Sequence, residues 1–119
     1  MGIALGTRHI VDALNQKGYE IRTLHLSGGH IANPLLVQLY ADASGCRVSI
    51  PKEEDSVLLG TAAVAATAAG VYGSLNEAAR AMIREGRSIE PSTATAAFFD
   101  RQYKRFLLMQ DHQRALRAA

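Results

Sequence analysis

Two short apolar segments on either side of one well-marked helix constrain this chain most. Residues 21–27 (IRTLHLS) alternate apolar and polar side chains, except that Arg22 and Thr23 are both polar, and residues 47–51 (RVSIP) form a second apolar run that ends in proline. Both patterns are typical of strands. Between them, Asn33 and Pro34 mark a helix start, because asparagine caps a helix and proline suits its first position; that helix ends near Gly45. A strand–helix–strand order predicts a parallel pair, since parallel strands need a crossover connection.

Apolar residues at helical spacing predict four further helices. They cover residues 3–16, 57–70 and 74–84, and the last runs from Pro91-Ser92 to about Ala118. We therefore expect an α/β chain with two parallel strands and about five helices. Within the second of these helices, the alanine-rich segment 60–70 carries small residues on every face, which predicts a helix buried against its neighbours.

Composition and charge exclude several functional classes. The chain has 119 residues, about one small domain, and a net charge of +2 from basic and acidic residues mixed along its length. With no basic stripe and few aromatics, we expect no nucleic-acid partner. The longest low-charge stretch, 57–72, is too short for a membrane span, and the first residues lead us to expect no signal peptide. Cys46 is the only cysteine, so we expect no disulfide and a reduced, cytoplasmic setting.

The junction SGGHIAN at 27–33 is the main candidate site. Glycine can adopt positive φ and lets a ligand approach the backbone, and open α/β sheets bind ligands at the carboxyl ends of their strands. Gly28, Gly29 and the helix start at Asn33 would then favour a phosphate or the polar edge of a ring. The alternative is that the glycines only allow a tight turn. His30, inside the loop, is either a ligand contact or a solvated side chain. The spacing matches neither a Rossmann fingerprint nor a P-loop.

The other polar residues form no recognisable catalytic group. The four histidines include no pair at the spacing of a helical zinc site, so we expect no metal site. Glu53, Glu54 and Asp55 precede a helix whose dipole they complement, which predicts a charged loop. Ser27 has no identifiable base partner and is not expected to be a nucleophile. Asp42 lies in a helix, where we expect local hydrogen bonds or ion pairs.

Several segments occur in a characteristic order. They are TRHIVDAL at 7–14, SGG at 27–29 with Asn33 after it, Gln38 and Asp42 in the helix, Gly45, VSIP at 48–51, Glu53-Glu54, LLGTAAVAA at 58–66 and FFDRQYKRFLLMQDHQRAL at 98–116. This series covers nearly the whole chain. It resembles the C-terminal part of the FGGY family of carbohydrate kinases and, within the family, the ribulokinase-like branch.

The resemblance implies a fold and a function. FGGY kinases transfer the γ-phosphoryl group of Mg-ATP to a sugar hydroxyl, and they consist of two actin-like (ribonuclease H-like) ATPase domains with a cleft between them. In the second domain a glycine pair and an asparagine contact the adenosine of the nucleotide. Carried over by position, these residues are Gly28, Gly29 and Asn33, with His30 in the wall of the loop. The expected cofactor is ATP with Mg, and the expected substrate is a pentulose such as ribulose.

The resemblance also limits what residues 1–119 are expected to do. They match the C-terminal part of the second domain, and nothing in them matches the catalytic aspartate or the sugar-binding residues of the N-terminal domain. Since phosphoryl transfer depends on positioning by those parts, we expect no kinase activity from this chain alone. We expect self-association, because strand edges and apolar helix faces lack their usual cover. The alternative function is a non-catalytic nucleotide-binding or protein-interaction module of actin-like ancestry.

Overall fold

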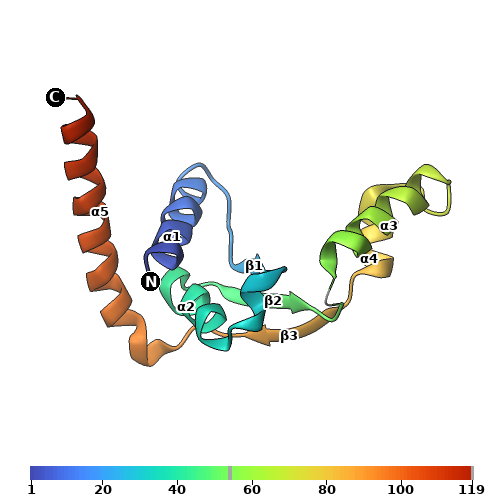
Figure 1. The fold of residues 1–119 in the computed structure, drawn as a ribbon, viewed down its shortest axis with the longest axis horizontal. Helices are drawn as coiled ribbons and strands as arrows, with labels where there is room; N and C mark the ends of the chain where they lie inside the picture. Colours follow the sequence, from blue (N-terminus) through green and yellow to red (C-terminus); the bar gives the residue numbers. More distant parts are fainter. Residues whose placement is uncertain (54, 119) are drawn as a thin grey trace.

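The computed structural model describes residues 1–53 and 55–118, and a three-stranded sheet lies near its centre (Figure 1). Strands β1 (Thr23–His25), β2 (Arg47–Pro51) and β3 (Glu85–Ile89) lie in that order across the sheet. β1 pairs with β2 in parallel, and β3 pairs with β2 antiparallel. The predicted α/β class and the predicted parallel pair are confirmed, and helix α2 (Pro34–Ser44) is the crossover between β1 and β2.

The third strand corrects the expectation of a two-stranded sheet. Residues 85–89 (EGRSI) show no apolar alternation, and the first four are exposed, because β3 is an edge strand. Gly86, which follows the helix predicted over residues 74–84, lies in β3 where the end of β2 approaches it closely. A Cβ at this position would lie 2.8 Å from the Cα of Lys52. Residues 85–89 therefore form a strand because they pair with β2, which is distant in the sequence, and not because of their own pattern.

The helices that follow Asn33 and Ser74 begin where their local caps predict, whereas the last helix begins at Ala96 and not at the predicted Pro91-Ser92. The Oδ1 atom of Asn33 accepts hydrogen bonds from two N–H groups of the first turn of α2, at 3.1 and 3.2 Å, and the helix ends at Gly45 with φ of +69°. Ser74 Oγ accepts a hydrogen bond from the N–H of Glu77 at 3.2 Å and caps α4. The helices are α1 (Gly2–Asn15), α2, α3 (Ser56–Ala68), α4 (Leu75–Met82) and α5 (Ala96–Ala118), with short 3-10 helices η1 (Gly29–Ala32) and η2 (Thr93–Thr95).

Helices α1, α2 and α5 pack against one another, and their side chains meet those of β2 in one hydrophobic core. Val37 of α2 and Val48 of β2 are fully buried, and each such side chain stabilises the fold by about 1.5–3 kcal/mol. The other large members of the core are Leu5, Tyr40, Ile50, Phe99 and Tyr103. The core therefore fixes α2, and with it the loop that precedes α2.

Hydrogen bonds hold the segment before α5 against α2. Asp42 accepts hydrogen bonds from the Ser92 N–H at 2.8 Å and from the Thr95 hydroxyl at 3.0 Å. Its Oδ1 atom also accepts one from Gln38 Nε2 at 2.7 Å. A local hydrogen bond or ion pair of Asp42 was expected from the sequence, with no partner named, and the bond to Gln38 is of this kind. The two bonds to the segment before α5 join residues that are far apart in the chain. Asp42 thus links α2 to the turn that precedes α5.

Two parts of the chain extend away from the core, namely the α3–α4 hairpin and the C-terminal half of α5 (Figure 1). The radius of gyration is 17.5 Å, whereas a compact chain of this length has about 13.5 Å. The prediction that the alanine-rich helix is buried is wrong for this chain. Ala63 is the only buried residue of α3, and the side chains of Val57, Leu58 and Val64 are more than half exposed. Over the described residues, no helix has both the length and the apolar character that crossing a membrane requires.

Candidate functional site

The loop between β1 and α2 contains the residues that the sequence singled out. Gly28 has φ of +80° and ψ of −164°, a region of backbone space that is essentially restricted to glycine. Its carbonyl accepts a hydrogen bond from the Ile31 N–H at 3.1 Å, which closes the turn into η1. The backbone of this turn therefore requires glycine at position 28, as the tight-turn alternative predicts.

Gly29 differs from its neighbour. It has no positive φ, and a Cβ built on it would meet no atom within 4 Å. Neither strain nor packing within the described chain requires glycine here. The tight-turn alternative therefore explains Gly28 and leaves Gly29 unexplained, with open space above its backbone.

His30 and Asn33 both have partners within the chain. A ring nitrogen of the exposed His30 lies 3.1 Å from the hydroxyl of Tyr40, which is buried in the core. The sequence left open whether this histidine is a ligand contact or solvated; in the structure its Nδ1 atom anchors the loop. The Oδ1 atom of Asn33 caps α2, so its side-chain NH₂ group is what remains to donate to a ligand.

Arg87 also holds the loop, and no pattern in the sequence predicted this role, because the residue belongs to the unpredicted strand β3. Its guanidinium donates a hydrogen bond to the carbonyl of Ile31 at 3.4 Å. The loop is thus supported by α2 through Tyr40 and by β3 through Arg87.

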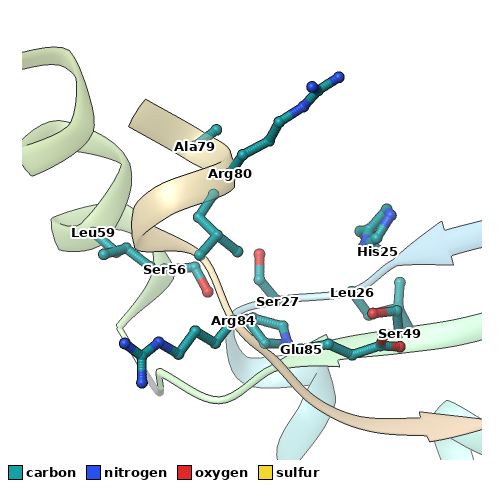
Figure 2. A pocket seen from close by; sticks show the side chains of 12 residues that line it. His25, Leu26, Ser27, Ser49, Ser56, Leu59, Ala79, Arg80, Arg84 and Glu85 are labelled. Carbon is teal, nitrogen blue, oxygen red and sulfur yellow. The ribbon is translucent and has the colours of Figure 1, made fainter. Parts of the chain in front are cut away.

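A cavity of about 570 Å³ lies beside this loop, at the carboxyl ends of β1 and β2 and below the α3–α4 hairpin (Figure 2). Its size is typical of small-molecule sites. Its walls combine apolar side chains with hydroxyl and basic groups. They are formed by His25, Leu26, Ser27, Ser49, Pro51, Ser56, Leu59, Ala79, Arg80, Ile83, Arg84 and Glu85. Ser27 directly precedes Gly28, so the cavity and the glycine loop are neighbours.

The charges around the cavity favour an anion. Among the described residues of the lining, Glu85 is the only acidic one, and it pairs with Arg47. The hydrogen bond from Arg47, followed by one from the Ser49 hydroxyl, lowers the pKa of Glu85, so this carboxylate stays ionised and neutralised by its partner. Arg80 and Arg84 have no ion pair among the described residues. The wall formed by α4 and the residues that follow it, up to Arg84, is therefore net positive.

The structure does not bring the other polar candidates to this site. His9 lies against Tyr103 in the core, and His112 lies on the distal part of α5. Asp55 caps α3 by accepting a hydrogen bond from the Leu58 N–H at 3.0 Å. Glu54 lies outside the described residues. Within the described chain, no three His, Cys, Asp or Glu side chains are grouped closely enough to hold a metal ion.

Comparison with protein families gives one match over more than half of the chain. Residues 1–69 match the C-terminal domain of the FGGY family of carbohydrate kinases. An FGGY carbohydrate kinase domain-containing protein of Xenopus laevis is 42% identical over 98% of this chain and 21% of its own length. A glycerol kinase of Pseudomonas fluorescens is 40% identical over 76% of this chain and 18% of its own length. A ribulokinase of Halalkalibacterium halodurans is 32% identical over 92% of this chain and 20% of its own length.

Solved structures show the same fold. The xylulose kinase from Rhodospirillum rubrum superimposes with a TM-score of 0.76 and 25% identity, over 96% of this chain and 23% of that one. Its fold is that of the actin-like ATPases, which confirms the fold expected from the resemblance. The relatives and this neighbour differ in the sugar or polyol that their names give, so the ribulokinase-like branch is not distinguished from the others. The chain spans about a fifth of the length of the curated relatives it matches.

Proposed function

The chain belongs to the FGGY family of carbohydrate kinases, and on that premise we propose that it forms the adenosine-binding portion of an ATP-dependent kinase that phosphorylates a sugar hydroxyl. The observation that carries the proposal is the place of the open Gly29 backbone, in the loop that joins the carboxyl end of β1 to α2. Nothing within the described chain requires glycine there, whereas a flat ligand lying on the backbone does.

The loop residues have separate tasks in this proposal. Gly28 sets the direction of the turn, and the backbone of Gly29, which no side chain covers, contacts the adenosine. His30 is held by Tyr40 at 3.1 Å and forms one wall, while Asn33 caps α2 through Oδ1 and keeps its NH₂ group for the ligand. Binding to a loop that is already ordered avoids part of the entropy cost of association.

Mg²⁺, which accompanies ATP in the family, neutralises charge on the phosphates when it is bound. Since the described residues offer no cluster of ligands for a metal, we assign no residue of this chain to it. We propose that the catalytic residues and sugar contacts belong to the N-terminal domain of a longer kinase, and that residues 1–119 alone have no kinase activity.

For the substrate we propose a pentulose such as ribulose. Two of the names above, ribulokinase and xylulose kinase, denote kinases of five-carbon ketoses. The buried free thiol of Cys46 supports a reducing, cytoplasmic location for the protein.

Nucleotide titration of the 119-residue chain tests the proposal. We expect saturable ATP binding by isothermal titration calorimetry, and we expect Gly29→Val to raise the Kd at least about tenfold, or about 1.4 kcal/mol. The added side chain would occupy the space that the adenosine needs. Gly6→Val is the matched control, because Gly6 of α1 also has open space around its Cβ position and no positive φ. The proposal would be contradicted if the native chain bound no ATP at millimolar concentration. It would also be contradicted if Gly29→Val and Gly6→Val both folded and lost the same amount of ATP affinity.

A non-catalytic interaction module is the second candidate function. The observation in its favour is the exposed apolar surface of the α3–α4 hairpin, where Val57, Leu58, Val71 and Leu75 are each more than half exposed. Surfaces of this kind mark protein interfaces. This candidate predicts that the chain binds a protein partner and binds no nucleotide.

A further inference from the structure

We propose that the side chains of the loop after β1 recognise the edge of the adenine base through hydrogen-bond donors alone, and that Tyr40 makes His30 one of these donors by fixing the ring proton on Nε2. The inference rests on the proposed function, because it takes adenosine to be the ligand of this loop. It adds which atoms of the base are recognised, namely the ring nitrogens. It also makes Tyr40 a positioning residue, which acts through His30 and does not touch the ligand.

Acceptor groups of the loop are engaged within the chain. The carbonyl of Gly28 accepts a hydrogen bond from the Ile31 N–H at 3.1 Å, and the carbonyl of His30 accepts one from the Asn33 N–H at 3.4 Å. Arg87 donates to the carbonyl of Ile31 at 3.4 Å. The Oδ1 atom of Asn33 accepts two hydrogen bonds from the first turn of α2. What the Asn33 side chain still offers to a ligand is therefore its NH₂ group, which is a donor.

Tyr40 determines which nitrogen of His30 carries the proton. Tyr40 belongs to the hydrophobic core and is only 5% exposed. Among the described residues, the one hydrogen-bond partner of its hydroxyl is the Nδ1 atom of His30, at 3.1 Å. A buried hydroxyl must donate its proton to an acceptor, because otherwise its desolvation is not offset. Tyr40 therefore donates to Nδ1, and a neutral imidazole that accepts at Nδ1 carries its own proton on Nε2.

This tautomer leaves the Nε2–H group of His30 available to a ligand. His30 is exposed, it directly follows Gly29 in the chain, and no described residue forms a hydrogen bond with its Nε2 atom. Residues 28–33 therefore offer two side-chain donors, the Nε2–H group of His30 and the NH₂ group of Asn33. They offer no free side-chain acceptor, because Nδ1 of His30 and Oδ1 of Asn33 are both engaged.

The adenine base has atoms that match donors. Its ring nitrogens accept hydrogen bonds, whereas its amino group donates them. A base that lies on the backbone of Gly29 presents its edge to the neighbouring side chains, so two donors can pair with ring nitrogens. The same donors cannot pair with the amino group, because two donors do not form a hydrogen bond with each other. We therefore expect the ring nitrogens to determine affinity and the amino group to contribute little.

A panel of nucleosides tests which atoms of the base are recognised. Isothermal titration calorimetry of the 119-residue chain should give purine riboside, which lacks the amino group, a Kd within about twofold of that of adenosine. In the monodeaza analogues of adenosine a C–H group replaces one ring nitrogen. At least one of them should bind about fivefold more weakly than adenosine, because a donor of the loop is then left unpaired. If loss of the amino group lowered the affinity as much as replacement of any ring nitrogen, the inference would be overturned.

A double-mutant cycle tests whether Tyr40 acts through His30. Tyr40→Phe removes the hydroxyl, keeps the ring in the core, and should raise the Kd of adenosine about threefold. In a His30→Ala background the same substitution should leave the Kd unchanged, because the group that it positions is absent. Tyr19→Phe is the matched control, since Tyr19 is 60% exposed, and it should not change the Kd. An equal effect of Tyr40→Phe with and without His30 would show that Tyr40 has a structural role alone and would overturn its assignment.

Nitrogen-15 NMR of the free chain separates this inference from the proposed function. In the neutral ring of His30 we expect a protonated Nε2, an unprotonated Nδ1, and a scalar coupling from the Tyr40 hydroxyl proton to Nδ1. In Tyr40→Phe the coupling should disappear and both tautomers should be populated. A proton on Nδ1 of the native chain would overturn the role of Tyr40. If the expected tautomer were found and adenosine did not bind, the proposed function would fail, while the assignment of His30 as an outward donor would stand.

Discussion

Gly28 and Gly29 are adjacent and identical in type, yet different physical reasons account for them. Gly28 has a backbone conformation that other residues adopt only with strain, whereas Gly29 has an ordinary conformation and open surroundings. The first glycine is therefore required by the fold, and we propose that the second is required by a ligand. Substitution of Gly28 should therefore affect the stability of the chain, whereas substitution of Gly29 should affect ligand binding.

Alanine substitutions test this difference in the free chain. Gly28→Ala should lower the free energy of unfolding by about 1–3 kcal/mol, because alanine must adopt the glycine conformation at φ of +80°. Gly29→Ala should change it by no more than about 0.5 kcal/mol, as at an ordinary surface position. Urea denaturation followed by circular dichroism measures both, and equal destabilisation by the two substitutions would contradict the argument.

Helix α5 depends on α2 for its position. The bonds from Ser92 and Thr95 to Asp42 fix the turn before α5, and Arg8 of α1 pairs with Asp100 at 2.8 Å. Beyond Tyr103, none of the described residues of the helix is buried. The first turns of α5 therefore behave as part of the core, while its end extends from the molecule (Figure 1).

Asp42→Ala should release the start of α5. Two donors in the turn lose their acceptor, which should lower the free energy of unfolding by about 1–3 kcal/mol and raise amide hydrogen exchange at residues 92–103. The matched control is Asp111→Ala on the exposed part of the same helix, where only a 3.8 Å pair with Arg114 is lost. Exposed pairs of this kind contribute about 0–1 kcal/mol. If amide hydrogen exchange at residues 92–103 were unchanged in Asp42→Ala, the hydrophobic core alone would hold α5 in position.

The molecule as a whole is more extended than a self-contained domain. Its dimensions are 53 × 36 × 27 Å, and large apolar side chains are exposed on both projecting parts, among them Leu58 on α3 and Met109 on α5. The free edges of β1 and β3 add unpaired backbone groups. In the proposed parent kinase these surfaces would contact other parts of the protein; in the isolated chain they predict self-association.

Light scattering over a range of concentrations tests that prediction. We expect the mass to rise above the 12.8 kDa of one chain as concentration increases, because association removes apolar surface from water. Leu58→Asp with Val64→Asp should weaken the association at least tenfold, since both side chains are exposed on α3. Thr61→Asp adds charge to an exposed polar position of the same helix and is the control. A monomer mass at every concentration would contradict the prediction.

Local signals explain which parts of the chain were predictable. Asn33 with Pro34 and Ser74 with Glu77 cap helices through bonds that span three residues or fewer, so their sequence is sufficient to mark a helix start. The order of strand, glycine pair, capped helix and strand likewise predicted the parallel pair and the position of the candidate loop. These features depend on backbone geometry and on side chains close together in the chain.

Contacts between distant segments decided the rest. EGRSI at 85–89 has no strand pattern of its own and forms β3 because its backbone pairs with the edge of β2 that β1 does not occupy. Arg87 then reaches Ile31, and the cavity arises where α3 and α4 meet the ends of β1 and β2. The pairing free energy of an edge strand and the volume between packed elements depend on residues far apart in sequence. For this reason the glycine loop could be found in the sequence, whereas the cavity beside it appears only once the chain is folded.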